Sequence, residues 1–110
     1  MNIIKYAEIV PAQIREGVER RVAHFENLML ALIDFHDGPK AELDPPYAHP
    51  HEQVTYMAEG KVLVEIGEES TRPGSGCVFI VPSNIFHSIQ QLTEHVRLVD
   101  CFNPIREDFV

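Results

Sequence analysis

The sequence has few basic residues, few cysteines and no long apolar run. Lysine and arginine number 9 against 17 aspartates and glutamates, which gives the 110-residue chain a formal charge of −8. A surface of that sign repels polyanions, so the composition argues against a nucleic-acid partner. A small anionic ligand is still compatible with it, because a few basic groups such as Arg106 can reverse the field inside one cavity.

No segment resembles a secretory signal or a membrane span. The first twenty residues lack an apolar core followed by a small-residue cleavage site, and no later apolar run approaches the roughly 20 residues that cross a bilayer. We therefore expect a cytoplasmic protein without a membrane partner. Its two cysteines, Cys77 and Cys101, are then expected to be reduced, semi-buried strand residues.

The chain also lacks internal repeats, low-complexity tracts and long helical segments. A chain of 110 residues can bury a substantial core but leaves no room for a second domain. Only residues 12–21 could form a helix, and Gly17 lowers its stability by about 1 kcal/mol relative to alanine. We expect a single domain over residues 1–110.

What the sequence does contain is a series of short β-branched or aromatic segments bounded by turn residues, a pattern typical of strands. These segments are residues 20–25, 28–36, 53–58, 61–66, 77–81, 87–91 and 96–102. Turn residues such as GEES at 67–70 and RPGSG at 72–76 separate them. The pattern predicts an all-β antiparallel sandwich or barrel, whose mouth can hold a ligand.

The segment YAHPHEQVTY places polar residues at alternate positions. In an extended strand, the residues that share a face are Tyr47, His49, His51, Gln53 and Thr55. If that face points to water, the histidines are ordinary solvated residues. If it points inward, each unpaired polar group costs about 1–3 kcal/mol. A shared divalent metal would satisfy them, because it accepts imidazole nitrogen and amide oxygen.

Two segments resemble the motifs of the cupin superfamily. HPHEQVTYMAEG at 49–60 is similar to its first motif, a histidine pair followed by Glu or Gln and a glycine turn. PGSGCVFIVPSNIFH at 73–87 is similar to its second motif. The resemblance implies a cupin barrel, a double-stranded β-helix or jelly roll, around one divalent transition metal, with Zn, Ni, Fe and Mn as candidates. Strand parity and motif position together make His49, Gln53 and His87 the expected ligands.

Nearly the whole chain can be laid along a narrower group, the pectin-degradation cupins called KdgF. The closing segment LVDCFNPIREDFV resembles theirs. This resemblance implies conversion of 4,5-unsaturated galacturonate, released from pectate or alginate, into its linear keto form. It also implies catalytic roles for Asp100 and Arg106 and a stacking role for Phe102 against the substrate.

Tyr47 departs from that family. Its members read His-Xaa-His-Pro-His-Xaa-Gln where this chain reads YAHPHEQ, so Tyr47 stands in place of the first metal-binding histidine. A phenol is a poor ligand near neutral pH because its pKa is about 10. Either His51 turns inward as the fourth ligand, or the site binds metal weakly, or it has lost the metal. We assign Tyr47 to substrate binding.

The C-terminal segment can also be interpreted from its residues alone, without the resemblance. Alternation places Asp100 and Phe102 on one strand face among apolar residues. Burial would raise the pKa of Asp100 toward a value suited to general acid or base catalysis, whereas a nearby cation such as Arg106 would lower it. Arg106 has a planar guanidinium group that can donate two parallel hydrogen bonds to a uronate carboxylate. The structural alternatives are an Asp100–Arg106 ion pair that fixes the tail over the barrel rim, and Phe102 as core filler.

Three functions are compatible with these residues. The first is a metal-dependent enzyme that opens an unsaturated uronate ring. The second is a non-catalytic cupin that binds a small sugar acid or other metabolite as a sensor or accessory module. The third, an iron dioxygenase, is disfavoured because Gln53 and Tyr47 reduce the anionic or imidazole donors.

The N-terminal segments IIKYAEIV and RRVAHF add more strand than one small barrel needs. Surplus strands can pair with a neighbouring chain by exchange or at a sheet edge. We therefore expect a homodimer.

Overall fold

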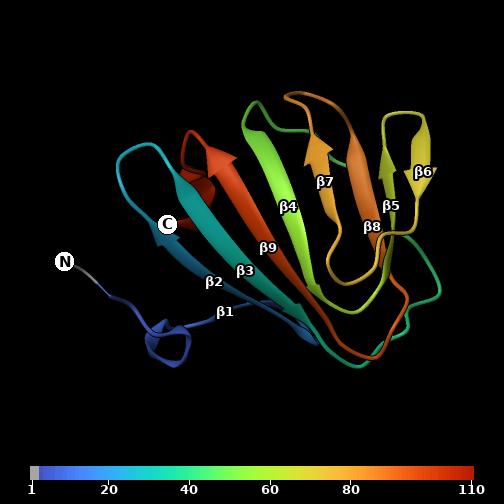
Figure 1. Ribbon diagram of the computed structural model, residues 1–110, viewed down its shortest axis with the longest axis horizontal. Helices are drawn as coiled ribbons and strands as arrows, with labels where there is room; N and C mark the ends of the chain where they lie inside the picture. The colour runs from blue at the N-terminus through green and yellow to red at the C-terminus, as the bar shows by residue number, and fades with distance from the viewer. Residues whose placement is uncertain (1–2) are drawn as a thin grey trace.

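The computed structural model describes residues 3–110, and antiparallel strands dominate it (Figure 1). The strands are β1 (Ala12–Arg15), β2 (Val18–His24), β3 (Met29–Phe35), β4 (Glu52–Glu59), β5 (Val62–Ile66), β6 (Glu69–Thr71), β7 (Val78–Val81), β8 (His87–Gln91) and β9 (Val96–Asn103). Two short 3-10 turns, η1 (Tyr6–Glu8) and η2 (Glu107–Phe109), lie near the ends. Each of the seven strands expected from the sequence is present, and the expected all-β antiparallel class is confirmed.

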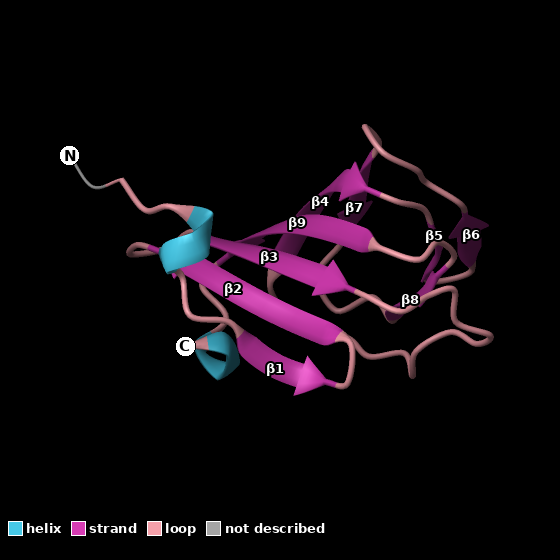
Figure 2. Cartoon of the chain, turned by 90° about the horizontal axis from the view of Figure 1, so that it is seen from below, coloured by secondary structure: helices cyan, strands magenta, loops and turns pink. Residues whose placement is uncertain are grey.

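The strands form two sheets. The larger sheet has the order β1-β2-β3-β9-β4-β7, and the smaller has the order β6-β5-β8. Figure 2 shows the smaller sheet at one side, with the long strands of the larger sheet running toward it. Because β9 pairs with both β3 and β4, strands far apart in the sequence lie side by side in the middle of the larger sheet.

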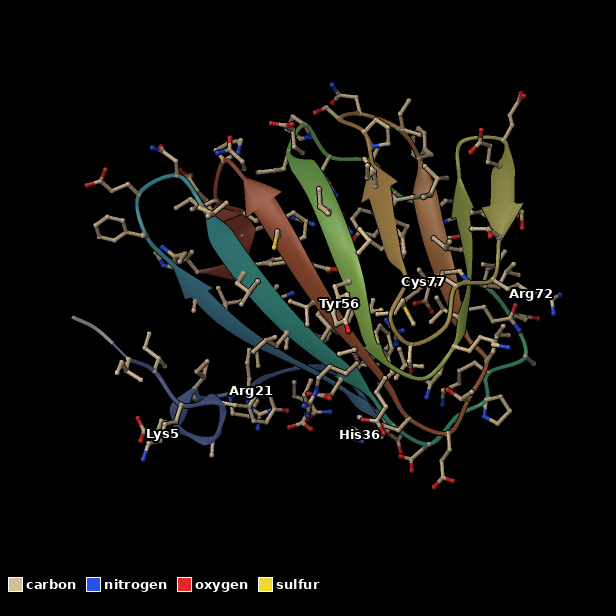
Figure 3. The ribbon with its side chains drawn as sticks, in the orientation of Figure 1. Lys5, Arg21, His36, Tyr56, Arg72 and Cys77 are labelled. Atoms are coloured by element: carbon tan, nitrogen blue, oxygen red, sulfur yellow. The ribbon has the colours of Figure 1, made fainter. Side chains whose placement is uncertain are left out.

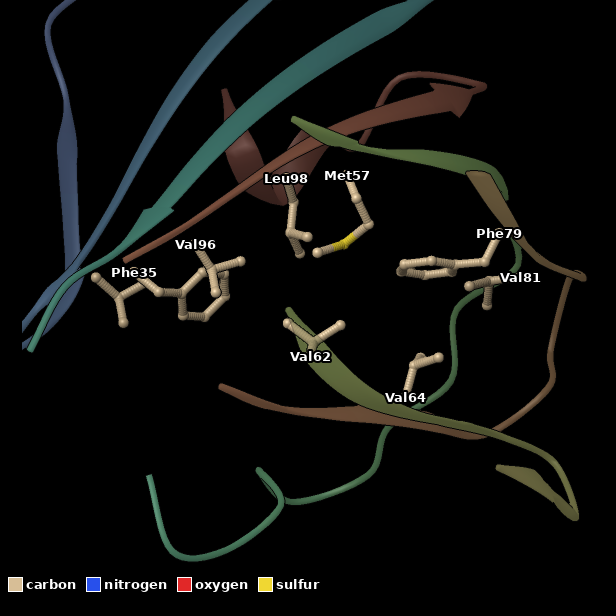
Figure 4. Packing of buried hydrophobic residues seen from close by; sticks show 9 residues of the cluster. Phe35, Met57, Val62, Val64, Phe79, Val81, Val96 and Leu98 are labelled. Carbon is tan, nitrogen blue, oxygen red and sulfur yellow. The ribbon is translucent and has the colours of Figure 1, made fainter. Parts of the chain in front are cut away.

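Apolar side chains from the two sheets form the core. Met57 and Leu98 of the larger sheet point toward Val62 of the smaller one (Figure 4), and all three are buried. A second, smaller cluster contains Met29, Ala31 and Phe102. In β9, the inward residue between Leu98 of the first cluster and Phe102 of the second is Asp100. A polar layer therefore lies between two apolar ones.

The N-terminal region corrects two expectations. Residues 12–21 do not form a helix. They form the β1–β2 hairpin, because Gly17 at the turn has a φ of +79°, a conformation that glycine adopts without steric cost. The segment IIKYAEIV is not a strand either, since it contains η1.

Two smaller expectations also change. The GEES segment contains the start of a strand, because the chain turns at Gly67 and returns as β6 from Glu69. Cys77 and Cys101 are free and exposed rather than semi-buried. Cys101 occupies an outward position of β9, and Cys77 precedes β7. Within residues 3–110, no helix is long and apolar enough to cross a membrane.

Tyr6 fixes the N-terminal segment to its own chain. Its hydroxyl donates to the carboxylate of Asp34 in β3 and accepts hydrogen bonds from Arg21 and Arg97. Asp34 is only 1% exposed. Burial alone would raise the pKa of Asp34, but the hydrogen bonds from Arg97, Tyr6 and His95 outweigh that effect and lower it. The segment that precedes β1 is thus held against β2, β3 and β9.

Candidate functional site

A cavity of about 380 Å³ lies between the two sheets. Apolar walls come from Phe35, Phe79 and Ile89, among others. Its polar lining includes Tyr47, Gln53, His87, Asp100 and Arg106. Five of the residues predicted for the site from the sequence therefore line one cavity.

Backbone carbonyls fix the tautomers of His49 and His87. The Nδ1 atom of His49 lies 3.1 Å from the carbonyl oxygen of His51, and that of His87 lies 3.1 Å from the carbonyl oxygen of Ile85. A carbonyl only accepts, so each Nδ1 carries the proton and each Nε2 presents a lone pair. The two rings are buried, with centroids 5.0 Å apart.

A chain of hydrogen bonds orients the Gln53 amide. Thr55 donates its hydroxyl hydrogen to Asp100 at 2.6 Å and accepts from the Gln53 Nε2 at 2.9 Å. The Gln53 Oε1 is thereby turned toward the His49 Nε2, 3.0 Å away. Two acceptor lone pairs face each other at that distance, an arrangement that a cation bound by both atoms would relieve.

The protonation of the imidazoles is disfavoured. Burial lowers the pKa of His49, and the positive charge of Arg106 lowers it further. Burial and Arg106 also lower the pKa of His87, against a hydrogen bond to Ile85. Among the described residues, the His87 Nε2 is buried without a hydrogen-bond partner. An orphaned imidazole nitrogen, a second imidazole and an amide oxygen form a donor set that fits a divalent transition metal.

Tyr47 lies at the mouth of this group. Its backbone exchanges two hydrogen bonds with that of His87, at 3.2 and 3.0 Å. The ring centroids of Tyr47 and His87 are 4.8 Å apart, and Tyr47 is 48% exposed. The phenol therefore stands beside the two imidazoles and faces the open side of the cavity.

His51 lies beside the group. Its ring centroid is 5.5 Å from that of His49, and its Nδ1 is buried without a hydrogen-bond partner among the described residues. His51 also borders a separate depression, lined by Glu26, Asn27, Pro104, Ile105, Glu107 and Asp108. The chain bends at Pro50 and His51, and β4 begins only at Glu52, so strand alternation does not extend back to His51. Across residues 3–110, no three His, Cys, Asp or Glu side chains are placed to hold one metal ion.

Asp100 is buried, with 4% exposure. Burial raises its pKa to about 6, although the hydrogen bond from Thr55 and the charge of Arg106 act in the opposite direction. The alternative of an Asp100–Arg106 ion pair is not what the described residues form. Arg106 pairs instead with Asp108, with Nη2 and Oδ2 separated by 2.9 Å, because η2 folds Asp108 back toward Arg106.

Phe102 lies beneath the site. It is 2% exposed, and its ring meets that of His49 edge to face at a centroid distance of 5.7 Å. Phe102 is not among the residues that line the cavity, so it supports His49 from behind. The aromatic rings that do line the cavity near Arg106 are those of Tyr47 and Phe109.

Arg20 and Phe109 were not predicted from the sequence as residues of this cavity. Both line it, and the Arg20 guanidinium carbon lies 3.6 Å from the centre of the Phe109 ring. Alternation with Val18 and Val22 was the available signal for Arg20, since it placed the three on one face. Nothing in a single sequence distinguishes a cavity-lining arginine from a solvated one.

Comparison with known proteins identifies a family, a related sequence and similar structures. Residues 34–102 match the family described as "Cupin domain". The "Pectin degradation protein KdgF" of Dickeya dadantii (strain 3937) is 28% identical over 100 residues, 89% of this chain and 88% of the relative. The structure of KdgF from Halomonas sp. matches with a TM-score of 0.89 at 26% identity, over 100% of this chain and 99% of that one. An RmlC-like cupin from Shewanella frigidimarina matches with a TM-score of 0.88 at 30% identity, over 100% and 96%.

Proposed function

This chain belongs to the cupin family, and we propose that it is a metal-assisted enzyme that opens the ring of a 4,5-unsaturated uronate to the linear keto form. The observation that carries this proposal is that Gln53, His87 and the buried carboxyl of Asp100 line one cavity, with the His49 Nε2 lying 3.0 Å from the Gln53 Oε1. The similarity to KdgF of Dickeya dadantii, a pectin degradation protein, supports a sugar acid as the substrate.

The residues that would hold one divalent transition metal are His49, Gln53 and His87, with Zn, Ni, Fe and Mn as candidates. When bound, the metal supplies Lewis-acid polarisation of substrate oxygens. The imidazoles donate hydrogen bonds to the carbonyls of His51 and Ile85, and these bonds hold both rings in orientation. Hydrogen-bond partners of metal-binding histidines commonly have this role. We propose His51 as the candidate for a further ligand, because its ring lies 5.5 Å from that of His49 and its Nδ1 is buried without a hydrogen-bond partner among the described residues.

The proton chemistry falls to Asp100. Its Oδ1 accepts from Thr55, which leaves Oδ2 to take the proton of the anomeric hydroxyl as the ring bond breaks. The same oxygen returns the proton to carbon 4, and the enol becomes a ketone. The reaction is an isomerisation without net proton change, and a carboxyl with a pKa of about 6 suits both halves near neutral pH.

The remaining cavity residues bind and orient. Arg106 donates to the substrate carboxylate, and the exposed ring of Tyr47 covers the sugar at the mouth. The apolar walls restrict water, which strengthens each polar contact within. We assign Phe102 to positioning His49, because its ring contacts the imidazole from behind.

The direct test is to add the purified, metal-supplemented protein to 4,5-unsaturated galacturonate and follow loss of the ring form. We expect a rate far above the spontaneous one, because positioning and acid–base catalysis together exceed about 10²-fold. Heat-denatured protein with the same metal is the control. An unchanged rate in the presence of each candidate metal would exclude the enzyme.

A second candidate is a non-catalytic cupin that binds a small sugar acid as a sensor or accessory module. Tyr47 favours it, because a phenol stands where related chains have a ligand, and it lies beside His87. Tight equilibrium binding of the uronate with no turnover would identify this binding protein.

We further propose a homodimer that pairs through the outer face of the larger sheet. Its outward residues include an apolar row across four strands, in which Leu30 pairs with Cys101, Cys101 with Val54 and Val54 with Ile80. The next row contains Tyr56, which faces outward in Figure 3. Contiguous exposed apolar rows of this kind favour association. The N-terminal segment is bound within its own chain, which argues against its exchange.

Tyr56→Glu is expected to convert the dimer into a monomer, because it places a charge in the centre of the apolar rows. Sedimentation at micromolar concentration should give twice the 12.5 kDa chain mass for the wild type and the single mass for the variant. Thr71→Glu, on exposed β6 of the other sheet, is the matched control. A wild type that sediments as a monomer would contradict this interface.

A further inference from the structure

Arg20 has an unpaired N–H group at the cavity. It extends from β2 into the lining, and its Nε atom is buried with no hydrogen-bond partner in residues 3–110. Among the ion pairs of residues 3–110, none involves Arg20. A buried, unpaired guanidinium N–H is unfavourable for folding, so this arrangement calls for a ligand that supplies an acceptor.

Arg106 lines the same cavity and, unlike Arg20, forms an ion pair, with Asp108. The two guanidinium carbons lie 3.6 and 4.1 Å from the centre of one aromatic ring, that of Phe109. The Nη1 of Arg106 is also buried without a partner among the described residues. Burial lowers the pKa of Arg20, and the charge of Arg106 lowers it further, while the charge of Asp108 raises it.

The local anions do not pair with every N–H group of the two arginines. Asp108 forms an ion pair with Arg106, and its own side chain is 60% exposed. Its charge also acts on Arg20, but without an ion pair. Asp44 pairs with Arg15 on another part of the rim. Asp100 lines the same cavity and interacts with the charge of Arg106. Two N–H groups without a partner are left, and a planar carboxylate matches them because each of its oxygens accepts from a guanidinium fork.

We propose that Arg20 and Arg106 together bind one carboxylate group of the ligand, and that Phe109 holds both guanidinium groups in place. The inference rests on the proposed function for the identity of the ligand, a sugar acid, and adds the second arginine and the selectivity it confers. Phe109 is a positioning residue, because it touches the arginines and packs edge to face on Phe102 at 5.7 Å. The site therefore selects sugar acids over neutral sugars.

The test measures binding without turnover. Galacturonate, which lacks the double bond and cannot react, is titrated calorimetrically beside galactose, its neutral counterpart. We expect the wild type to prefer galacturonate, and Arg20→Gln to lose about 10–100-fold of galacturonate affinity with galactose binding unchanged. The matched control is Arg72→Gln, which removes the same charge from an exposed position after β6, at the edge of the molecule in Figure 3.

Stability separates binding from a structural role. Arg20→Gln removes a repulsive pair along with a stacking contact, so its melting temperature is expected within about 4 °C of wild type. A purely structural arginine would change the melting temperature and affect both sugars equally. Arg20→Lys keeps the charge without the planar fork and should retain only part of the preference; it also serves if Arg20→Gln does not fold.

The possible outcomes distinguish the two-arginine site from the ring-opening function. Unchanged galacturonate affinity in Arg20→Gln, or a wild type that binds the two sugars equally, overturns the two-arginine site. If galacturonate binding depends on Arg20 while the unsaturated uronate is not turned over, the ring-opening function fails and the two-arginine site stands. If turnover proceeds in Arg20→Gln with wild-type kcat and KM, the enzyme stands and the two-arginine site fails.

Discussion

Asp100→Asn is expected to lower kcat for uronate ring opening by about 10²–10⁴-fold, the range for loss of a general acid–base group. The amide keeps the shape of the carboxyl and can still accept from Thr55 through its oxygen, as Asp100 does now. It has no site for the transferred proton near neutral pH. Galacturonate affinity should be retained, since the carboxylate is bound elsewhere in the cavity. Single-turnover rates and calorimetric titration of the same preparation measure the two quantities.

The same substitution is expected to stabilise the fold at neutral pH. Burial raises the pKa of Asp100 from 3.8 to about 6. Between these values the folded state binds more protons than the unfolded state, so this group's contribution to stability falls as pH rises and is lost above about pH 6. Because one pKa unit corresponds to about 1.36 kcal/mol, Asp100→Asn should gain up to about 3 kcal/mol there, and nothing below about pH 4.

Urea unfolding of both proteins across this pH range measures the difference. A gain that does not depend on pH would mean that Asp100 is not a buried carboxyl with a raised pKa. Wild-type activity should also fall on acidification through about pH 6, because the base must be ionised to accept the anomeric proton. Thr55 and Arg106 are the groups that act on this carboxyl.

Two substitutions are expected to change metal binding at the site in opposite directions. His87→Ala removes the orphaned Nε2 and should lower the metal content after dialysis to less than about a tenth of wild type, since each ligand of a three-donor site is essential. Tyr47→His should raise metal affinity by at least about 10–100-fold, the range that even outer-sphere groups control. An imidazole replaces a phenol there, beside His87.

Elemental analysis after dialysis against equimolar Zn, Ni, Fe and Mn measures the content, and competition with a chelator gives the affinity. His24→Ala serves as the matched control, because His24 is an exposed histidine at the end of β2. Equal metal content in His87→Ala and wild type would remove His87 from the proposed ligands. A Tyr47→His variant without tighter binding would show that this position does not reach the metal.

Alternation along β4 and β9 could be predicted because it is a local property of extended backbone. Gln53, Thr55 and Met57 are buried while Val54 and Tyr56 are not, as the spacing implied. The same holds in β9, where Asp100 and Phe102 face inward. Facing inward is not the same as lining a cavity, and the sequence could not separate Asp100, which lines it, from Phe102, which does not.

Alternation alone could not settle positions that depend on turns and strand ends. His51 shares parity with His49, but the bend at Pro50 precedes the start of β4, so alternation does not establish where the His51 ring lies. Arg106 was weighed as the partner of Asp100, yet η2 brings Asp108 within 2.9 Å of it. A one-residue change in where a strand begins or a turn closes is enough to redirect a side chain.

The contact between Arg20 and Phe109 could not be predicted from the sequence for a different reason, its long range. The two residues are 89 positions apart in the numbering of the chain and meet only because η2 folds back over β2. Neither residue type is unusual at its position, so neither local propensity nor alternation marks them. Such a site becomes visible only when the cavity and its unpaired polar atoms are known.

The central position of β9 has a consequence for folding during synthesis. On one side of it lie β1, β2 and β3, and on the other lie β4 and β7. Until residue 103 has left the ribosome, β3 and β4 each present an unpaired edge, and such edges are prone to pair with other chains. The nascent chain is thus two open half-sheets, and chaperone dependence should be greatest just before β9 emerges.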